Sequence, residues 1–195
     1  LIEYYADIHA GRAYGNTSVR NGRFLRPEIK LLRPASIIDY GCGQSRLLDQ
    51  LELDYPLEMR RYDPAIPAFS RKPEGVYDLL ISIDVLEHIP EPDLDPVIEE
   101  IRSLCRNAIL IVDTIPAKLI LPNGENAHAT IKPKDWWAQK LGRHFPHLVP
   151  IKTARSWRAA FRTWDHTPEE EAAFRQLRRA EDISYYRGRV RYLAG

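Results

Sequence analysis

The stretch SIIDYGCG, residues 36–43, decides the fold. Residues 36–40 form a β-branched, apolar run typical of a buried strand, and two glycines follow it closely. Gly41 permits a turn with positive φ, and Gly43 lets a ligand approach the backbone. Ser45 can cap a following helix over residues 46–53, whose free N–H groups would face the same point. The pattern predicts a strand, a tight turn and a helix that together bind a ligand.

Apolar runs and helical patterns alternate along the rest of the chain. Further strands are predicted at residues 58–62, 76–83 and 108–112, with weaker ones near 148–154 and 158–164. Helices are predicted at residues 27–33, with Pro27 in the first turn, and at 93–106, 134–141 and from 167 onward. This order is typical of an α/β protein. We expect a Rossmann-like three-layer sandwich with a mostly parallel sheet, whose ligands bind beyond the carboxyl ends of the strands.

The length of 195 residues fits a single domain. We expect N-terminal lid helices over residues 1–34, a core over 35–165 and a C-terminal helix over 166–195. The two cysteines lie far apart, which favours a reducing, cytoplasmic setting. No apolar run approaches the ~18 residues that span a membrane, and the first residues show no signal-peptide pattern. The sequence does not indicate an oligomeric state.

Charge is unevenly distributed although the whole chain carries a net charge of only +1. Residues 1–34 carry a net charge of +3 and residues 151–195 a net charge of +4, so the middle is acidic. Basic ends around an acidic body could steer an anionic substrate. Alternatively, the arginines only solubilise terminal helices.

Two carboxylates flank the glycine turn in the sequence. Asp63 ends the second predicted strand twenty residues after Gly43, where a carboxylate can accept the hydroxyls of a ribose. Asp39 stands two residues before the first glycine, where it suits an amino group and would repel a pyrophosphate. Arg46 occupies the place of the third glycine of the dinucleotide pattern. These residues favour S-adenosylmethionine (SAM) over NAD. A turn without a ligand would leave Asp39 as a buried acid with no partner.

A second motif, DVLEHI at residues 84–89, follows the third predicted strand. Together with DYGCG at residues 39–43 it resembles the class I SAM-dependent methyltransferases, over about residues 36–140. The resemblance implies that the turn flanks the methionine part of SAM, that Asp63 holds the ribose, and that Asp84 lies beside the cofactor or the substrate. The expected cofactor-binding set is Asp39, Tyr40, Gly41, Cys42, Gly43, Asp63, Pro64, Asp84, Val85 and, from the N-terminal lid, Tyr14.

The chain departs from that family between Asp63 and the third strand, where only about a dozen residues intervene. The family usually places a helix, another strand and an acidic adenine-binding loop there. The short interval suggests that the outer third strand is missing and that residues 64–69 contact the adenine instead.

The Glu87-His88 pair and the later His128 resemble the O-methyltransferases of ubiquinone biosynthesis. Those enzymes, and the methyltransferases of small-RNA terminal riboses, hold a divalent cation with such a set. By position this implies Asp84, Glu87, His88 and His128 as ligands of zinc or magnesium, which would activate a bound hydroxyl. The alternative is that no metal binds and that His88 acts as a general base or packs beside the site. In either case Glu87, His88 and His128 are the expected catalytic residues.

The sequence therefore predicts a SAM-dependent methyltransferase. The resemblance favours O-methylation of a hydroxyl on a small polar acceptor, a sugar being the first candidate. Two alternatives remain: a nucleic-acid methyltransferase that uses the basic ends as a phosphate track, and a non-catalytic nucleoside-binding module. No membrane partner is expected.

Overall fold

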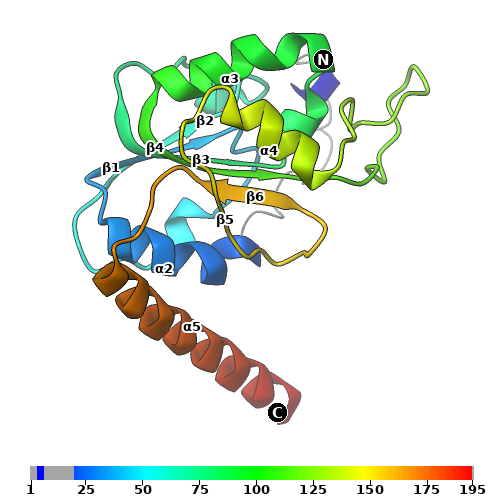
Figure 1. Ribbon diagram of the computed structural model, residues 1–195. Coiled ribbons are helices and arrows are strands. Elements are labelled where there is room, and N and C mark those ends of the chain that lie inside the picture. Colours follow the sequence, from blue (N-terminus) through cyan, green and yellow to red (C-terminus); the bar gives the residue numbers. More distant parts are fainter. Residues whose placement is uncertain (1–3, 7–19, 195) are drawn as a thin grey trace.

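A computed structural model describes residues 4–6 and 20–194, with side chains as far as residue 187. Its centre is a six-stranded sheet with helices on both faces (Figure 1). The strands, in the order of the sheet, are β2 (Glu58–Tyr62), β1 (Ser36–Tyr40), β3 (Tyr77–Ile83), β4 (Cys105–Val112), β6 (Ala159–Arg162) and β5 (Val149–Pro150). The helices are α2 (Gly22–Leu32), α3 (Leu94–Ser103), α4 (Lys134–Gly142) and α5 (Pro168–Ala194).

The sheet is mostly parallel. Strands β2, β1, β3 and β4 run the same way, and β6 pairs antiparallel with both β4 and β5. The four parallel strands therefore end together at one edge, at Tyr62, Tyr40, Ile83 and Val112. The predicted α/β Rossmann-like fold is confirmed, and the predicted site residues that follow these strands share one edge of the sheet.

Two apolar cores cover the two faces of the sheet. On one face α3 and α4 bury residues such as Ile98, Ile101 and Trp137. On the other face α2 buries Leu25 and Ile29 against β1, β3 and β4. Figure 1 shows these layers, with α3 and α4 above the sheet and α2 below it. Residues 22–32 of the predicted lid segment thus form part of the core.

Helix α2 begins five residues earlier than the sequence suggested, so Pro27 lies inside it. A proline there cannot donate a hydrogen bond to the carbonyl of Arg23, four residues before it. The guanidinium of Arg178 donates to that carbonyl instead, at 2.9 Å. The side chain from α5 thereby compensates for a bond that α2 cannot make.

The sheet lacks an outer strand beyond β2 among the residues that the structure describes, as the short interval suggested. Residues between Asp63 and Tyr77 form only the 3-10 turn Pro67–Phe69. The helix predicted over residues 46–53 is likewise reduced to the 3-10 turn Leu48–Gln50. The hydroxyl of Ser45 accepts a hydrogen bond from the Leu47 N–H at 3.0 Å, but the N-cap of the 3-10 turn is Leu47, so Ser45 does not cap this turn as predicted.

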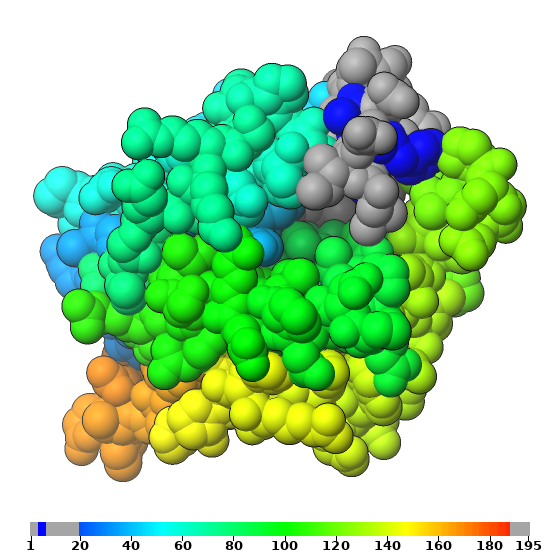
Figure 2. Space-filling model, turned by 90° about the horizontal axis from the view of Figure 1, so that it is seen from above, coloured from blue at the N-terminus to red at the C-terminus, as the bar shows by residue number. Residues whose placement is uncertain are grey.

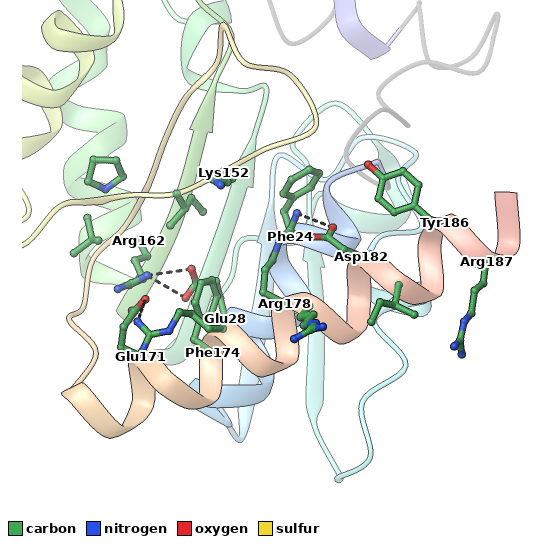
Figure 3. Close-up of a pocket in the computed structure, with 16 residues that line it drawn as sticks. Phe24, Glu28, Lys152, Arg162, Glu171, Phe174, Arg178, Asp182, Tyr186 and Arg187 are labelled. Atoms are coloured by element: carbon green, nitrogen blue, oxygen red, sulfur yellow. Dashed lines mark hydrogen bonds and ion pairs between the residues drawn. The ribbon is translucent and has the colours of Figure 1, made fainter. Parts of the chain in front are cut away.

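Helix α5 packs across α2 and leaves the body at its far end (Figure 1). A buried ion pair lies beneath its first turns: Arg162 of β6 donates to both oxygens of Glu28 on α2, at 3.1 and 3.3 Å. Both side chains are at least nine-tenths buried, and the Glu28 carboxylate lies 3.2 Å from the ring of His166. Figure 3 shows this pair at the floor of a groove between α5 and β5. No helix among the described residues is long and apolar enough to cross a membrane.

Candidate active site

The glycine turn after β1 is held by the end of β2. The N–H groups of Gly41 and Cys42 both donate to the carbonyl of Tyr62, at 2.8 and 3.0 Å. Gly41 has φ +71°, a backbone conformation that disfavours a side chain. A Cβ at Gly41 would also overlap the side chain of Val85. The turn that follows β1 and the residues that follow β3 are therefore in direct contact.

Asp63 faces the glycine turn. One oxygen of its carboxylate accepts from the Gly43 N–H at 2.8 Å, and the other accepts from the Ala65 N–H at 2.9 Å. Each carboxylate oxygen can accept more than one hydrogen bond. The Asp63 carboxylate thus fixes the turn and retains acceptor capacity for a ribose hydroxyl.

Asp39 is a buried acid, with 2% of its surface exposed. Its Oδ2 atom has no hydrogen-bond partner among the described residues. Burial raises the pKa of this carboxyl to about 7, while Arg61 opposes the shift and Asp63 adds to it. A buried orphan oxygen beside a ligand-binding turn is the feature that a cationic amino group of a ligand would satisfy.

The other residues predicted to bind the cofactor differ in their exposure and contacts. The Tyr40 side chain packs in the core against Tyr62, so only its backbone belongs to the turn. Cys42 is buried, and burial raises the pKa of its thiol, which disfavours the thiolate. Pro64 is exposed at the start of the loop that replaces the outer strand. Tyr14 lies outside the described residues.

Asp84 follows β3 and has φ +57°, a strained conformation for a residue with a side chain. Its carboxylate is bound by the buried Arg158, whose guanidinium donates to it at 2.6 Å. Arg158 also lies 3.6 Å from the carboxylate of Asp113, which follows β4. Neither Arg158 nor Asp113 was predicted as a site residue. Arg158 lies 74 residues from Asp84 along the chain, so the sequence gives no sign of this contact.

Glu87 is fully buried where the ends of β3 and β4 meet. Its Oε1 atom accepts from the Asp113 N–H at 3.0 Å, and its backbone carbonyl accepts from the Thr130 N–H at 2.9 Å. Its Oε2 atom has no hydrogen-bond partner among the described residues. Burial, together with the charge of Asp84, raises the pKa of Glu87 well above its usual value.

His88 and His128 face each other, with ring centroids 4.9 Å apart and planes at 82°. The Nδ1 atom of His88 lies 2.8 Å from the carbonyl of Ala127, and Nδ1 of His128 lies 2.6 Å from the carbonyl of Ile115. Since a carbonyl can only accept, these contacts place a proton on Nδ1 in both rings, so Nε2 is the ring nitrogen left to meet a ligand. Burial lowers the pKa of His88 to about 4, and His128 adds to the shift.

The structure brings three of the four predicted metal ligands together. Glu87, His88 and His128 each offer one ligand atom, and these atoms lie within 4.8 Å of one another. Asp84 is not part of this group, because Arg158 binds its carboxylate. Tyr5 is a fourth neighbour that the sequence analysis missed: its hydroxyl lies 2.6 Å from Nδ1 of His88.

A cavity of about 1070 Å³ opens beside the two histidines. Its walls come from Tyr4 and from residues between positions 88 and 97 and between 121 and 129. Figure 2 shows residues 4–6, in blue, beside the yellow-green segment that contains residues 121–129. The side chain of Asn126 shapes this segment by bonding the N–H and the carbonyl of Ala117, at 3.0 and 2.9 Å.

Comparison with solved structures identifies the fold. The chain is similar to the mitomycin 7-O-methyltransferase MmcR (TM-score 0.54, 12% identity, covering 74% of this chain and 53% of that one). It is also similar to human N-acetylserotonin methyltransferase in complex with SAM (0.54, 16%, 75% and 52%). A third similar structure is the methyltransferase domain of bacterial CtHen1 (0.53, 16%, 75% and 97%). The chain spans about half the length of the first two proteins.

The sequence comparisons are more specific. No curated protein matches the chain. A family profile described as a methyltransferase domain matches residues 17–178, which is most of the chain. The glycine turn and the carboxylates at the strand ends are features expected of such a domain, so the geometry of the site agrees with the profile match. The chain therefore belongs to the methyltransferase domain family.

Proposed function

We propose that the enzyme transfers the methyl group of SAM to a hydroxyl oxygen of a small acceptor bound in the cavity beside His88 and His128. One observation carries this proposal: the imidazoles of His88 and His128 lie against each other at the cavity wall, and His88 stands three residues after Val85, which touches the glycine turn. The similarity to solved O-methyltransferases supports the same reaction.

In this proposal the glycine turn and the two strand-end carboxylates hold SAM. The amino group of its methionine part donates to the orphan Oδ2 of Asp39, and the ribose hydroxyls donate to Asp63. The positive φ of Gly41 and Gly43 shapes the turn along which the cofactor lies. The sulfonium methyl then lies toward Val85 and the residues that follow it, where the acceptor enters.

The histidines prepare the acceptor. In methyl transfer the acceptor oxygen forms a bond to the methyl carbon as the carbon–sulfur bond breaks, and the hydroxyl proton must leave. A pKa of about 4 keeps His88 neutral at physiological pH, so its Nε2 can accept a hydrogen bond or the proton. His128 contributes a second imidazole at the same place, with its Nδ1 on the carbonyl of Ile115.

A divalent cation fits the same residues. Two imidazoles with Nδ1 fixed on carbonyls, and a buried carboxylate with an unpartnered oxygen, are a donor set suited to zinc. Such an ion would lower the pKa of a bound hydroxyl. In its absence the burial that raises the pKa of Glu87 favours the protonated form of that carboxyl. Asp84 is not a ligand in this proposal, because its carboxylate binds Arg158 at the end of β3.

Methyl transfer from labelled SAM to a panel of phenols, catechols, sugars and nucleosides tests the proposal. We expect His88→Ala and His128→Ala to reduce turnover at least tenfold while leaving SAM affinity within about threefold. The exposed His147 provides a matched control, because His147→Ala removes an imidazole far from these residues in the sequence and outside the cavity lining. Modification of amines or thiols but of no hydroxyl would refute the proposal, and a sugar as the acceptor stays a prediction until that panel is run.

The metal is tested separately by zinc titration. We expect Glu87→Gln to keep the hydrogen bond from the Asp113 N–H through its amide oxygen, and so to preserve stability, while weakening zinc binding at least tenfold. Equal zinc affinity in the wild type, Glu87→Gln and His128→Ala would show that these residues hold no ion.

A further inference from the structure

The cavity beside the histidines has a one-sided charge. Half of the fourteen described residues that line it are apolar, among them Ile89, Val97 and Leu121. Asp93 and Glu125 are the charged residues of the described lining, which contains no lysine or arginine. Among the described lining residues an anionic acceptor would meet two carboxylates and no counter-charge.

The two carboxylates lie on the solvent side of the cavity. Asp93 and Glu125 are exposed, whereas His88 and His128 are partly buried. One oxygen of Glu125 accepts from the Asn123 amide at 2.8 Å, which holds the carboxylate in place. The Asp93 side chain has no hydrogen-bond or ion-pair partner among the residues that the structure describes. The uncharged end of the cavity therefore faces the histidines, and the negative charge lies at its mouth.

Two basic residues flank the 121–129 segment in the sequence, Lys118 and Lys132, and neither is among the described lining residues. The ammonium of Lys132 pairs with Glu91 at 2.8 Å. The acidic mouth thus remains available to a ligand. It also keeps a cationic group away from the sulfonium of SAM, which carries the same sign of charge.

We propose that the acceptor carries its hydroxyl on an apolar body with a cationic amine, and that Asp93 and Glu125 bind that amine at the cavity mouth. The inference rests on the proposed function, because it takes this cavity as the acceptor site. Apolar walls suit an aromatic or aliphatic body better than a sugar. Phosphorylated acceptors and nucleic acid strands are disfavoured by the same two carboxylates.

The expected preference is moderate, because both carboxylates are exposed. A pair of opposite unit charges about 4 Å apart in water gains roughly fivefold in affinity, and a like pair loses a similar factor. An amine should therefore bind at least tenfold tighter than a matched carboxylate. Added salt should reduce the difference, as it does for surface charges.

Three catechols that differ mainly in charge provide the test: dopamine, 4-methylcatechol and 3-(3,4-dihydroxyphenyl)propionate. Their affinities are measured by ligand-observed NMR titration with S-adenosylhomocysteine bound. We expect the order dopamine, methylcatechol, propionate in the wild type. In the double variant Asp93→Asn/Glu125→Gln the ratio of dopamine to propionate should fall below threefold, with unchanged affinity for S-adenosylhomocysteine. Glu91→Gln is the matched control, since it removes an exposed carboxylate that does not line the cavity.

The outcomes separate this inference from the proposed function. Equal or tighter binding of the propionate, a ratio unchanged in the double variant, or no binding of any catechol would overturn the inference. If hydroxyl compounds are methylated without regard to charge, the proposed function stands and the inference fails. If dopamine binds with the expected preference but no hydroxyl compound is ever methylated, recognition by the cavity stands and the proposed function fails.

Discussion

We expect Asp39 to make the binding of the cofactor depend on pH. In the free protein burial raises the pKa of this carboxyl to about 7. In the complex the ammonium of the ligand should hold it ionised, because an opposite charge at hydrogen-bond distance lowers the pKa of a carboxyl. Binding of SAM or S-adenosylhomocysteine must therefore displace a proton whenever the pH lies below about 7.

The magnitude follows from that pKa. Below it, the apparent dissociation constant rises about tenfold for each pH unit, which gives a rise of roughly 25-fold between pH 7.5 and pH 5.5. The α-amino group of the ligand stays largely protonated in this window, since its pKa is about 8. Calorimetric titration with S-adenosylhomocysteine measures the constant. Repeating it in buffers of different ionisation enthalpy should show about half a proton released at pH 7.

The variant Asp39→Asn tests separately the effect of Asp39 on ligand binding and its effect on the stability of the ligand-free protein. It should bind the ligand more weakly with a nearly flat pH dependence, because position 39 no longer titrates. It should also stabilise the ligand-free protein at pH 8 by up to about 4 kcal/mol, since the wild type must bury a charge whose pKa is raised from 3.8 to about 7. This stabilisation should shrink as the pH falls from 7 toward 4, where the native carboxyl is protonated. A wild-type dissociation constant that stays level from pH 7.5 to 5.5, with no proton release, would refute the reasoning.

Three further substitutions test the framework of the site. Gly41→Ala should abolish detectable cofactor binding and destabilise the fold, whereas Gly75→Ala, with a similar positive φ but open space around it, should cost only about 1 kcal/mol in urea unfolding. Glu28→Ala should cost about 3–5 kcal/mol, because it leaves Arg162 buried without its partner, and replacing both residues by apolar ones should restore most of that loss. Arg158→Met should destabilise the fold by about 2–4 kcal/mol in urea unfolding, because it leaves the carboxylates of Asp84 and Asp113 without their shared partner. An Arg158→Met variant as stable as the wild type would contradict the pairing.

The central strands were predictable from the sequence because each contains a buried apolar run, and the Asp63-Pro64 pair marks the end of the more polar strand at residues 58–62. Residues 36–40 and 58–62 were predicted with the observed bounds, and Asp39 and Asp63 accordingly lie at the predicted edge of the sheet. The approach of His128 to His88 followed from the resemblance to known enzymes. It was not derivable from spacing, since 40 residues of strand, helix and loop separate the two rings.

What the sequence could not supply are contacts that need the whole fold. The role of Arg158 depends on β6 running antiparallel beside β4, which places the residue before β6 next to the ends of β3 and β4. The start of α2 depends on Arg178, which binds the carbonyl that Pro27 cannot serve. No local feature of the sequence indicates that the helix after the glycine turn is shortened to the 3-10 turn Leu48–Gln50. Ser45 would be equally suited to precede a full helix.

Glu87 links the end of β4 to the segment that lines the acceptor cavity. Its side chain holds the end of β4 through the Asp113 N–H, and its backbone holds the acceptor-side segment through Thr130. Between those anchors, residues 121–126 are mostly exposed and are shaped by the Asn126 side chain rather than by packing against the sheet. Substitutions at exposed positions such as Glu125 can therefore change which acceptor binds at little cost in stability, while the glycine turn and its carboxylates stay as they are. We therefore expect acceptor preference to depend on exposed residues of the cavity lining, which the fold leaves free to vary. The fold alone does not predict the acceptor, whereas the charge of the cavity does.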